Sequence, residues 1–374
     1  MATKLKNVPN LLLRAYMAKT NVYLRGKPAM GKTDTTNLFC ERMKQRVPEF
    51  RIWNFYGPTM SPTDIQMAMP DIQTKTLEVF NNGTLPNAYT HPDVAGVVFI
   101  GEMPNTDPTT LKLLQKYING EDMNGTLRKP KNVMVIADGN RLEDKSGVAQ
   151  HGRALLSRFM TIDVYTESED CIEYAAKHSW HPFVQSMMRE HPDTIDNYER
   201  VFLTNDAERK RAEAQNRRGE GRAGLLAEEG KNGIWASMRG WNRVSELEFA
   251  AEELGDPLTI DEVTGSVGSA VSSLYEAHKS MIGRLASLED VLKNPDTVEV
   301  PKKMDELYAM AQILSLRVKE DQLATLYKFA KRIQYDMQAF MLRTMMLRKG
   351  FKLVGSDVYR KWILDPQLNK LING

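Results

Sequence analysis

The sequence predicts an α/β fold whose first part is a parallel five-stranded sheet with helices on both faces, followed by a part made of helices alone. Five short apolar runs alternate with helical patterns over residues 1–166, and this alternation is typical of parallel sheets with helical crossovers. From Glu167 onward the periodicity is helical. The predicted strands cover residues 21–25, 50–56, 96–101, 132–137 and 159–164.

A glycine-containing loop separates the first predicted strand from a helix predicted over 34–46. It fits the pattern G-x-x-x-x-G-K-S/T with the residues Gly26, Lys27, Pro28, Ala29, Met30, Gly31, Lys32 and Thr33, and Asp34 follows it. The two fixed glycines let the backbone wrap around a phosphate at a helix N-terminus. We expect Lys32 to reach the β- and γ-phosphates of ATP and the Thr33 hydroxyl to bind Mg²⁺. The alternative is a glycine-containing turn with a chance lysine.

Residues that end the later strands are expected to face the same phosphate, because ligands of parallel sheets lie at the carboxyl ends of the strands. Glu102 follows the third apolar run and is the candidate general base for water. Asn140 follows the fourth run, and we expect its amide to hold that water or the γ-phosphate. Arg158 precedes the fifth run and is expected to reach the γ-phosphate of a neighbouring subunit. Taken singly, they are also explained as a solvated acid, a turn residue and a helix-capping arginine.

Composition and charge exclude several classes of protein. Hydrophobic residues make up 42% and charged residues 26% of the 374 residues, as in a soluble protein of two or three domains. The net charge of +2 argues against a broad nucleic-acid footprint. Cys40 and Cys171 are too few for a disulfide framework, and no apolar run approaches the roughly 18 residues of a membrane span. We therefore expect a soluble, cytoplasmic protein, in the host cytoplasm if the chain is viral.

The helical patterns after residue 166 predict two further domains. The three predicted domains are a nucleotide-binding domain at 1–166, a helical lid at 167–262 and a helical C-terminal extension at 263–374. Within the lid, the segment 207–233 is charged and poor in apolar residues, so we interpret it as an inserted loop. Amphipathic helices are predicted over 267–292 and 304–349, the second as a helical hairpin.

With these residues, the chain resembles the AAA+ superfamily, and specifically the MoxR-like ATPases of bacteria and their viruses. The resemblance covers about residues 21–164 and resumes at 235–247. The sequence Pro-Thr-Met-Ser-Pro-Thr-Asp-Ile at 58–65 looks like the segment after the second strand of the family. Ser-Arg-Phe at 157–159 is similar to its finger motif, and Ser-Met-Arg-Gly-Trp at 237–241 to the start of its lid helix.

The resemblance implies a role for each matched residue. Lys32 and Thr33 correspond to Walker A, Glu102 to the Walker B glutamate, Asn140 to sensor 1, Arg158 to the finger and Arg239 to sensor 2. It also implies a homo-oligomer, usually a hexamer, that uses ATP and Mg²⁺ to remodel or help assemble a partner protein. In this family the partner often carries a von Willebrand A-type domain.

Two positions depart from the family pattern. The family has Asp-Glu at the end of the third strand, whereas Gly101 precedes Glu102 in this chain. The carboxylate that holds the waters of Mg²⁺ is then missing, so we expect slow hydrolysis, unless Thr33 and the phosphates retain the metal. Met238 replaces the proline before the lid arginine, which affects helix initiation only. Arg153 is open to two interpretations, an assisting residue in trans or a surface charge.

Two other functions stay open beside the ring-forming ATPase. A scaffold that binds ATP with little turnover is favoured by Gly101. A DNA-translocating motor is favoured by Leu-Leu-Ser-Arg-Phe at 155–159, which is also similar to the finger motif of replicative helicases, but the near-neutral charge speaks against it. In a ring, we expect pore-facing residues within 71–86 or 119–130.

Three further features are interpreted as structural. The histidines His178, His181 and His191, with Cys171 nearby, lack the second cysteine or the carboxylate pair of a metal site. The basic residues between 209 and 222 are interspersed with glutamates and lack aromatic neighbours, which indicates a solvated loop rather than a nucleic-acid surface. Three methionines near the end are expected in a core or at a partner surface: Met341, Met345 and Met346.

Overall fold

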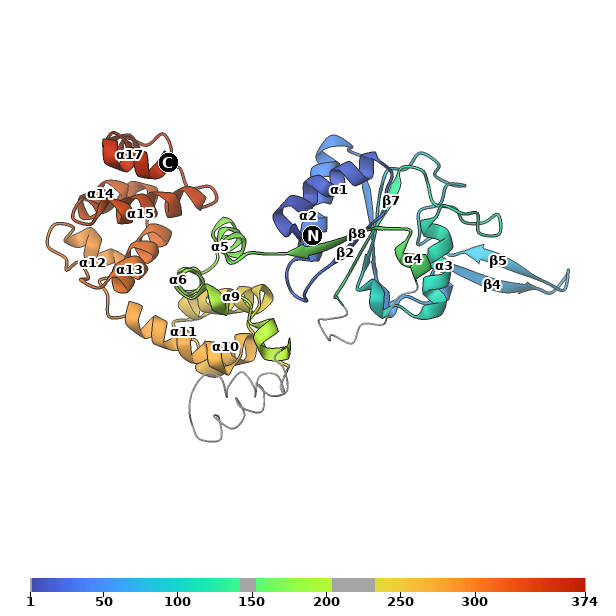
Figure 1. The fold of residues 1–374 in the computed structure, drawn as a ribbon, viewed down its shortest axis with the longest axis horizontal. Helices are drawn as coiled ribbons and strands as arrows, with labels where there is room; N and C mark the ends of the chain where they lie inside the picture. Colours follow the sequence, from blue (N-terminus) through green and yellow to red (C-terminus); the bar gives the residue numbers. More distant parts are fainter. Residues whose placement is uncertain (1, 142–152, 204–232, 374) are drawn as a thin grey trace. The chain divides into compact units, whose positions relative to one another are not determined.

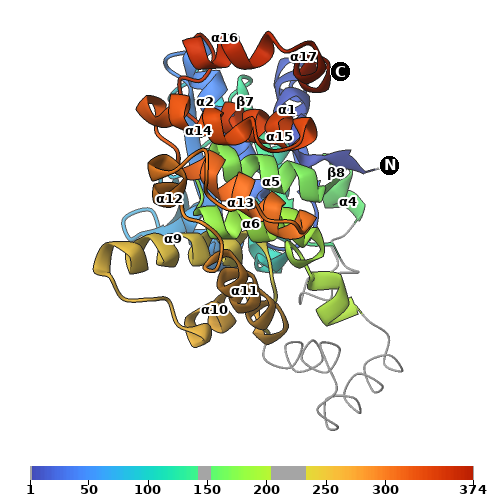
Figure 2. The ribbon, with the colours of Figure 1, turned by 90° about the vertical axis from the view of Figure 1, so that its left-hand side faces the viewer.

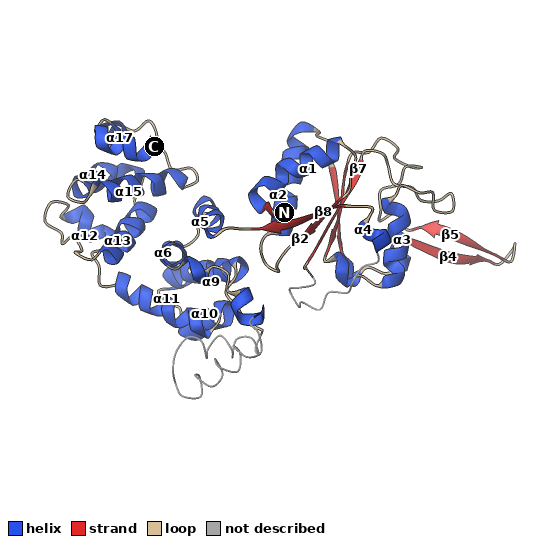
Figure 3. Ribbon diagram, viewed as in Figure 1, coloured by secondary structure: helices blue, strands red, loops and turns tan. Residues whose placement is uncertain are grey.

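The computed structural model describes residues 2–141, 153–203 and 233–373. The chain divides into two compact units, Met1–Thr166 and Glu167–Gly374 (Figure 1). All strands of the described residues belong to the first unit, and the second unit consists of helices and their connections (Figure 3). None of the described helices is long and apolar enough to cross a bilayer. The predicted inserted loop lies, apart from residue 233, outside the described residues, and the division of the helical part at 262 stays a prediction.

The first unit is built on a six-stranded parallel sheet with the order β1-β8-β2-β7-β6-β3. Its strands are β1 (Thr3–Lys4), β2 (Val22–Arg25), β3 (Arg51–Tyr56), β6 (Gly96–Gly101), β7 (Val133–Gly139) and β8 (Met160–Tyr165). All five predicted strands are present, so the α/β class with a parallel P-loop sheet is confirmed. The predicted number of strands is wrong, because β1 adds a sixth at the edge. A strand of two residues is too short to show an alternating pattern.

Alternate residues of the central strands face opposite sides of the sheet, and helices cover both sides (Figure 1). On one side, Phe99 of β6 belongs to a buried cluster with α1 (Val8–Met17) and α2 (Lys32–Arg46). On the other side, Ile100 belongs to a buried cluster with α3 (Pro108–Ile118). The near-continuous apolar sequence of β6 follows from this double burial.

A β-hairpin outside the main sheet was not evident from the sequence. Its strands β4 (Gln66–Asp71) and β5 (Thr76–Asn81) are antiparallel, and among the described residues they pair only with each other (Figure 3). Large apolar side chains along it are exposed: Met67, Met69, Ile72, Leu77 and Phe80. The hairpin overlaps the range 71–86, and the second range, 119–130, contains an antiparallel bridge between Met123 and Leu127. That either range faces a pore stays a prediction.

The second unit packs its helices around two main buried clusters. The helices around the first cluster, which contains Trp241, are α5 (Ser168–Lys177), α6 (Pro182–Glu190), α9 (Met238–Leu254), α10 (Ile260–Val267) and α11 (Ser269–Ile282). The helices around the second, which contains Trp362, are α12 (Leu288–Lys293), α13 (Met304–Arg317), α14 (Leu323–Ala330), α15 (Tyr335–Leu347), α16 (Asp357–Ile363) and α17 (Pro366–Asn373). The helix α6 contacts both groups, because it packs against α13 and against α9 and α11, and Figure 2 shows α5 between α15 and α13.

The segment 304–349 does not form the predicted helical hairpin. It contains the three helices α13, α14 and α15, with a short 3-10 turn at Glu320–Gln322 between the first two. The polar run at 319–322 interrupts the apolar periodicity, and the backbone of Val318 leaves the helical region there. Met341 and Met345 are buried in the core, as expected, whereas Met346 is 44% exposed.

Candidate nucleotide site

The phosphate loop, residues 26–33, connects β2 to α2 and requires glycine at both fixed positions. Gly31 is the N-cap of α2 with φ +95°, a left-handed conformation that favours glycine. A Cβ on Gly26 would lie 2.4 Å from the Met30 Sδ and 2.9 Å from the Val164 Cγ2. Glycine is therefore required at position 31 for its backbone conformation and at position 26 for close packing.

The Lys32 side chain is turned back onto this loop and is only 8% exposed. Its Nζ donates hydrogen bonds to the carbonyl oxygens of Gly26 and Lys27, both at 2.7 Å, and to the Asn140 Oδ1 at 3.1 Å. A nearly buried ammonium group needs such oxygen acceptors, because burial without them is costly. The structure thus holds a positive charge within the loop. Asn140, which follows the fourth predicted strand, contacts this charge.

Glu102 directly follows β6 and has a left-handed backbone, with φ +50° and ψ +41°. Its Oε2 accepts hydrogen bonds from the Tyr56 hydroxyl at 3.1 Å and from the Asn105 Nδ2 at 3.3 Å. The hydrogen bond to this carboxylate raises the pKa of Tyr56. These two contacts orient the carboxylate, and Tyr56 is a residue of the site that the sequence did not indicate.

Asp138, near the end of β7, is a buried carboxylate to which the sequence analysis assigns no role. Its side chain is 5% exposed, and its Oδ1 accepts a hydrogen bond from the Glu102 N–H at 2.8 Å. The Thr33 hydroxyl donates to its Oδ2 at 3.3 Å. Burial raises the pKa of Asp138, although the Glu102 N–H and the Lys32 charge act in the opposite direction. The signal in the sequence is an acid at the end of an otherwise apolar strand.

The oxygens beside the phosphate loop are of the kind that Mg²⁺ binds. The Thr33 hydroxyl and the Asp138 carboxylate lie together at the start of α2. Mg²⁺ in nucleotide sites is held by one or two protein oxygens in addition to phosphates and waters. This donor set therefore fits the ion.

Gly139 fixes the path of the chain between Asp138 and Asn140. A Cβ at this position would lie 2.4 Å from the Pro104 Cγ and 2.7 Å from the Tyr23 hydroxyl. The backbone of β7 therefore approaches the segment after β6 closely, and this approach brings the two strand ends together.

Arg158 follows α4 (Arg153–Leu156), and its side chain bonds to Ala154 and Gln115 rather than to the phosphate loop of its own chain. A guanidinium NH group donates to the Ala154 carbonyl oxygen. With the Gln115 side-chain amide oriented oxygen-first, that oxygen accepts from both terminal nitrogens of Arg158, at 3.0 and 3.1 Å. The arginine is thus held against α3, and its role in trans stays a prediction.

Arg239 belongs to the second unit and lies exposed in the first turn of α9. This helix begins at Met238 without the proline of the family, because the Ser237 hydroxyl caps it by accepting from the Gly240 N–H at 3.2 Å. The departure at Met238 therefore does not prevent the helix from starting. The sensor 2 role of Arg239 stays a prediction.

The histidines considered for a metal site do not converge. His178 is stacked on Tyr174 with 3.8 Å between the ring centroids. His181 is fully buried and lies 3.1 Å from the Glu252 carboxylate. His191 lies instead beside Glu190 and a histidine of α11, as described next.

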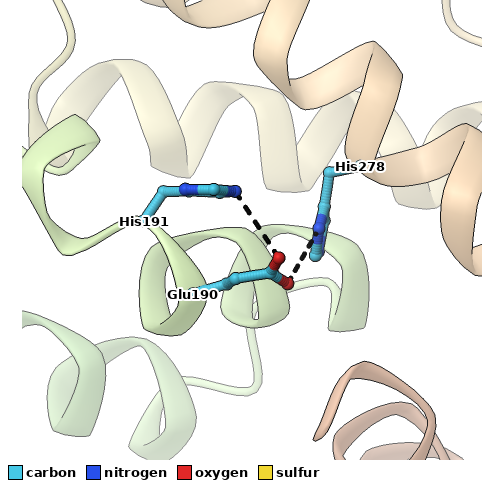
Figure 4. A group of neighbouring side chains, drawn as sticks. All are labelled: Glu190, His191 and His278. Atoms are coloured by element: carbon cyan, nitrogen blue, oxygen red, sulfur yellow. Dashed lines mark ion pairs between the residues drawn. The ribbon is translucent and has the colours of Figure 1, made fainter. Parts of the chain in front are cut away.

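Glu190 lies between His191 and His278 in the second unit (Figure 4). One carboxylate oxygen is 3.7 Å from the His191 Nε2, and the other is 3.2 Å from the His278 Nδ1. The other ring nitrogen of His278 is 3.0 Å from the Ser186 hydroxyl. Burial and the neighbouring His191 lower the pKa of His278 to about 4. These contacts account for the group, which by itself carries no argument for a metal.

No protein-family model matches the sequence, and no curated protein matches it significantly. Among solved structures, the chain is similar to a candidate ATPase from Cytophaga hutchinsonii, with 18% identity over 48% of this chain and 52% of that one and a TM-score of 0.34. It is also similar to RuvB of Thermotoga maritima, a Holliday junction branch migration motor, with 15% identity over 78% and 74% and a TM-score of 0.34. The chain spans about half the length of the first of these proteins. Likenesses of this size assign no function.

Proposed function

We propose that the chain is an AAA+ ATPase of the MoxR-like type. It binds ATP with Mg²⁺ as a ring-forming homo-oligomer and couples hydrolysis to the remodelling or assembly of a partner protein. The observation that carries this proposal is the arrangement of Lys32, Glu102 and Asn140 around one phosphate loop, at the carboxyl ends of β2, β6 and β7.

Binding of ATP requires Lys32 to exchange partners. In the free protein its Nζ bonds to the carbonyl oxygens of Gly26 and Lys27. Phosphate oxygens are stronger acceptors for a cation than neutral carbonyl groups, so the lysine turns to the β- and γ-phosphates. Mg²⁺, when bound, neutralises charge on the phosphate oxygens, with the Thr33 hydroxyl among its ligands.

Glu102 acts as the general base that accepts a proton from the attacking water. Its carboxylate is oriented by Tyr56 and Asn105, so it is held in place before the substrate arrives. Asn140 holds the water or the γ-phosphate by its amide. A positioned general base contributes about 10²- to 10⁴-fold to such a reaction.

The finger and the lid make turnover depend on assembly. Arg158 of one subunit stabilises the γ-phosphate bound by its neighbour, and Arg239 couples the state of the nucleotide to the helical lid. A hexamer and a partner with a von Willebrand A-type domain are the assembly that the family resemblance supports.

Steady-state ATP hydrolysis with Mg²⁺ tests this proposal, with the oligomer mass measured with and without ATP. We expect turnover in the native protein, loss of nucleotide binding in Lys32→Ala, and retained binding without turnover in Glu102→Gln. A matched variant, Glu49→Gln, removes an exposed acid outside the site and outside the predicted pore ranges, and should behave as the native protein. A protein that binds no ATP would contradict the proposal.

A second candidate function is an ATP-bound scaffold, because Gly101 lacks the carboxylate of the family. A ring that forms with ATP and shows no turnover would support the scaffold and exclude the motor. Turnover that rises on addition of DNA would instead favour a translocase.

A further inference from the structure

The strand register places Gly101 and Asp138 next to each other. Ile100 of β6 pairs with Ala137 of β7 in the parallel sheet. The residue that follows in each strand is therefore Gly101 in one and Asp138 in the other. The chain thus has a glycine where the family has an acid, and an acid at the adjacent position of the neighbouring strand.

Both positions face the side of the sheet that α2 covers. Phe99 and Ile136 belong to the buried cluster on that side. Side chains alternate along a strand, so the positions two residues later, 101 and 138, point to the same side. Because α2 begins at Lys32 and Thr33, an acid at either position faces the start of this helix.

The Asp138 carboxylate also lies close to the space beside Gly101. A Cβ on Gly101 would be 3.8 Å from the Asp138 Oδ1, an ordinary van der Waals distance. The other oxygen of the same carboxylate is 3.3 Å from the Thr33 hydroxyl. The Asp138 carboxylate therefore lies between the position that a side chain at 101 would occupy and Thr33, the residue expected to bind Mg²⁺.

We propose that Asp138 supplies, from β7, the carboxylate that helps Thr33 to hold Mg²⁺ and that position 101 no longer provides. This inference rests on the proposed function, because it concerns the same nucleotide site. A purely structural role, accepting the Glu102 N–H bond, does not require a charge, since a neutral amide oxygen also accepts such a bond. The Lys32 charge already lies near this buried acid, and the place of the acid beside the hydroxyl expected to bind Mg²⁺ favours a second cation there. The slow hydrolysis expected from Gly101 then no longer follows.

The test uses Asp138→Asn, which keeps the shape of the side chain and an acceptor for the Glu102 N–H. The binding of a fluorescent, non-hydrolysable ATP analogue is measured without metal and during a Mg²⁺ titration, and bound Mn²⁺ is measured by electron paramagnetic resonance. We expect metal-free nucleotide affinity to change less than about twofold. The Mg²⁺ concentration for half-maximal effect should rise by about 10- to 100-fold, as for the loss of groups that support a metal site.

Two further variants make the test specific. Asp138→Asn combined with Gly101→Asp returns the acid to β6, where the Cβ has room, and should recover most of the Mg²⁺ affinity. Glu41→Gln removes the charge of an exposed acid on α2, away from the phosphate loop, and should leave the Mg²⁺ half-point unchanged. The second variant thereby separates an effect of this one carboxylate from a general change in charge.

The outcomes distinguish a failure of this inference from a failure of the proposed function. If the native protein binds Mg²⁺-nucleotide and Asp138→Asn binds it equally well, the inference is wrong and the proposed function stands. If Asp138→Asn weakens metal-free nucleotide binding as much, or if Gly101→Asp recovers nothing, Asp138 is a structural acid and the inference is also wrong. If the native protein binds no nucleotide, both fail.

Discussion

The left-handed backbone of Glu102 predicts that the candidate general base is held at a cost in stability. A residue with a Cβ at φ +50° is strained by about 1 kcal/mol or more, whereas asparagine adopts this region several-fold more readily than most residues. We therefore expect Glu102→Asn to be more stable than Glu102→Gln. Both variants remove the carboxylate and should lose turnover, but only the first relieves the backbone.

The expected difference follows from two opposing contributions. Relief of the left-handed strain adds about 1 kcal/mol to the free energy of unfolding of the first unit. The shorter asparagine gives up the contacts of Glu102 with Tyr56 and Asn105, which are exposed and together contribute about 0.5 kcal/mol. The net gain over Glu102→Gln is about 0.5 kcal/mol, or roughly a twofold change in the unfolding equilibrium.

Amide hydrogen exchange of the buried strands β6 and β7 measures this difference directly. Under conditions in which exchange follows the unfolding equilibrium, peptides from these strands should exchange about twofold more slowly in Glu102→Asn than in Glu102→Gln. The glutamine variant is the matched control, because it keeps the length and the strain of the native residue. Equal exchange in the two variants would refute the reasoning that the backbone of Glu102 stores strain.

Further predictions concern packing and pH. Trp241→Phe removes the indole N–H that donates to the Thr194 carbonyl at 2.9 Å, so we expect the second unit to lose about 2 kcal/mol, seen as a lower Tm; an unchanged Tm would contradict this. Gly139→Ala drives a methyl group into a proline ring and should destabilise the first unit by about 1 to 3 kcal/mol, with faster exchange in β7, and unchanged exchange would count against it. The pKa of His278 is about 4 in the folded protein and about 6.5 when unfolded, so the unfolded state binds more protons between these values. The contribution of His278 to the free energy of unfolding should be fully present above pH 6.5 and fall by up to about 3 kcal/mol toward pH 4. Urea unfolding at several pH values measures this, and His278→Gln should lose less. A flat profile would mean that the contact with Glu190, which opposes the shift in pKa, outweighs burial.

The sequence predicts those parts of the fold that follow from local pattern. Each central strand is an apolar run bounded by turn residues, so all five could be located, and the phosphate loop has fixed residues at fixed spacing. The edge strand β1 could not be located, because its two residues pair with β8 only through tertiary contact. The breaks between α13, α14 and α15 escaped prediction since they depend on a few polar residues within a long apolar pattern.

The candidate site shows the same limit at the level of single residues. Lys32 was predicted from the spacing of the phosphate-loop motif, and Glu102 and Asn140 from their places after apolar strands. In the structure Lys32 contacts Asn140, and Glu102 is joined to the same site through Asp138. The role of Asp138 depends on the register between β6 and β7, which no local pattern contains. Tyr56 reaches Glu102 for the same reason, because β3 and β6 are neighbours in the sheet although they are far apart in the sequence.

The β4–β5 hairpin has a consequence for anyone who purifies the protein. Among the described residues its two strands pair only with each other, so each has an outer edge of backbone N–H and C=O groups that can accept a further strand. Ile72 at the turn is 87% exposed, and Leu77 is 70% exposed. Open edges beside apolar side chains favour pairing between molecules, so protein concentration and a charged substitution at Leu77 become the practical controls over precipitation.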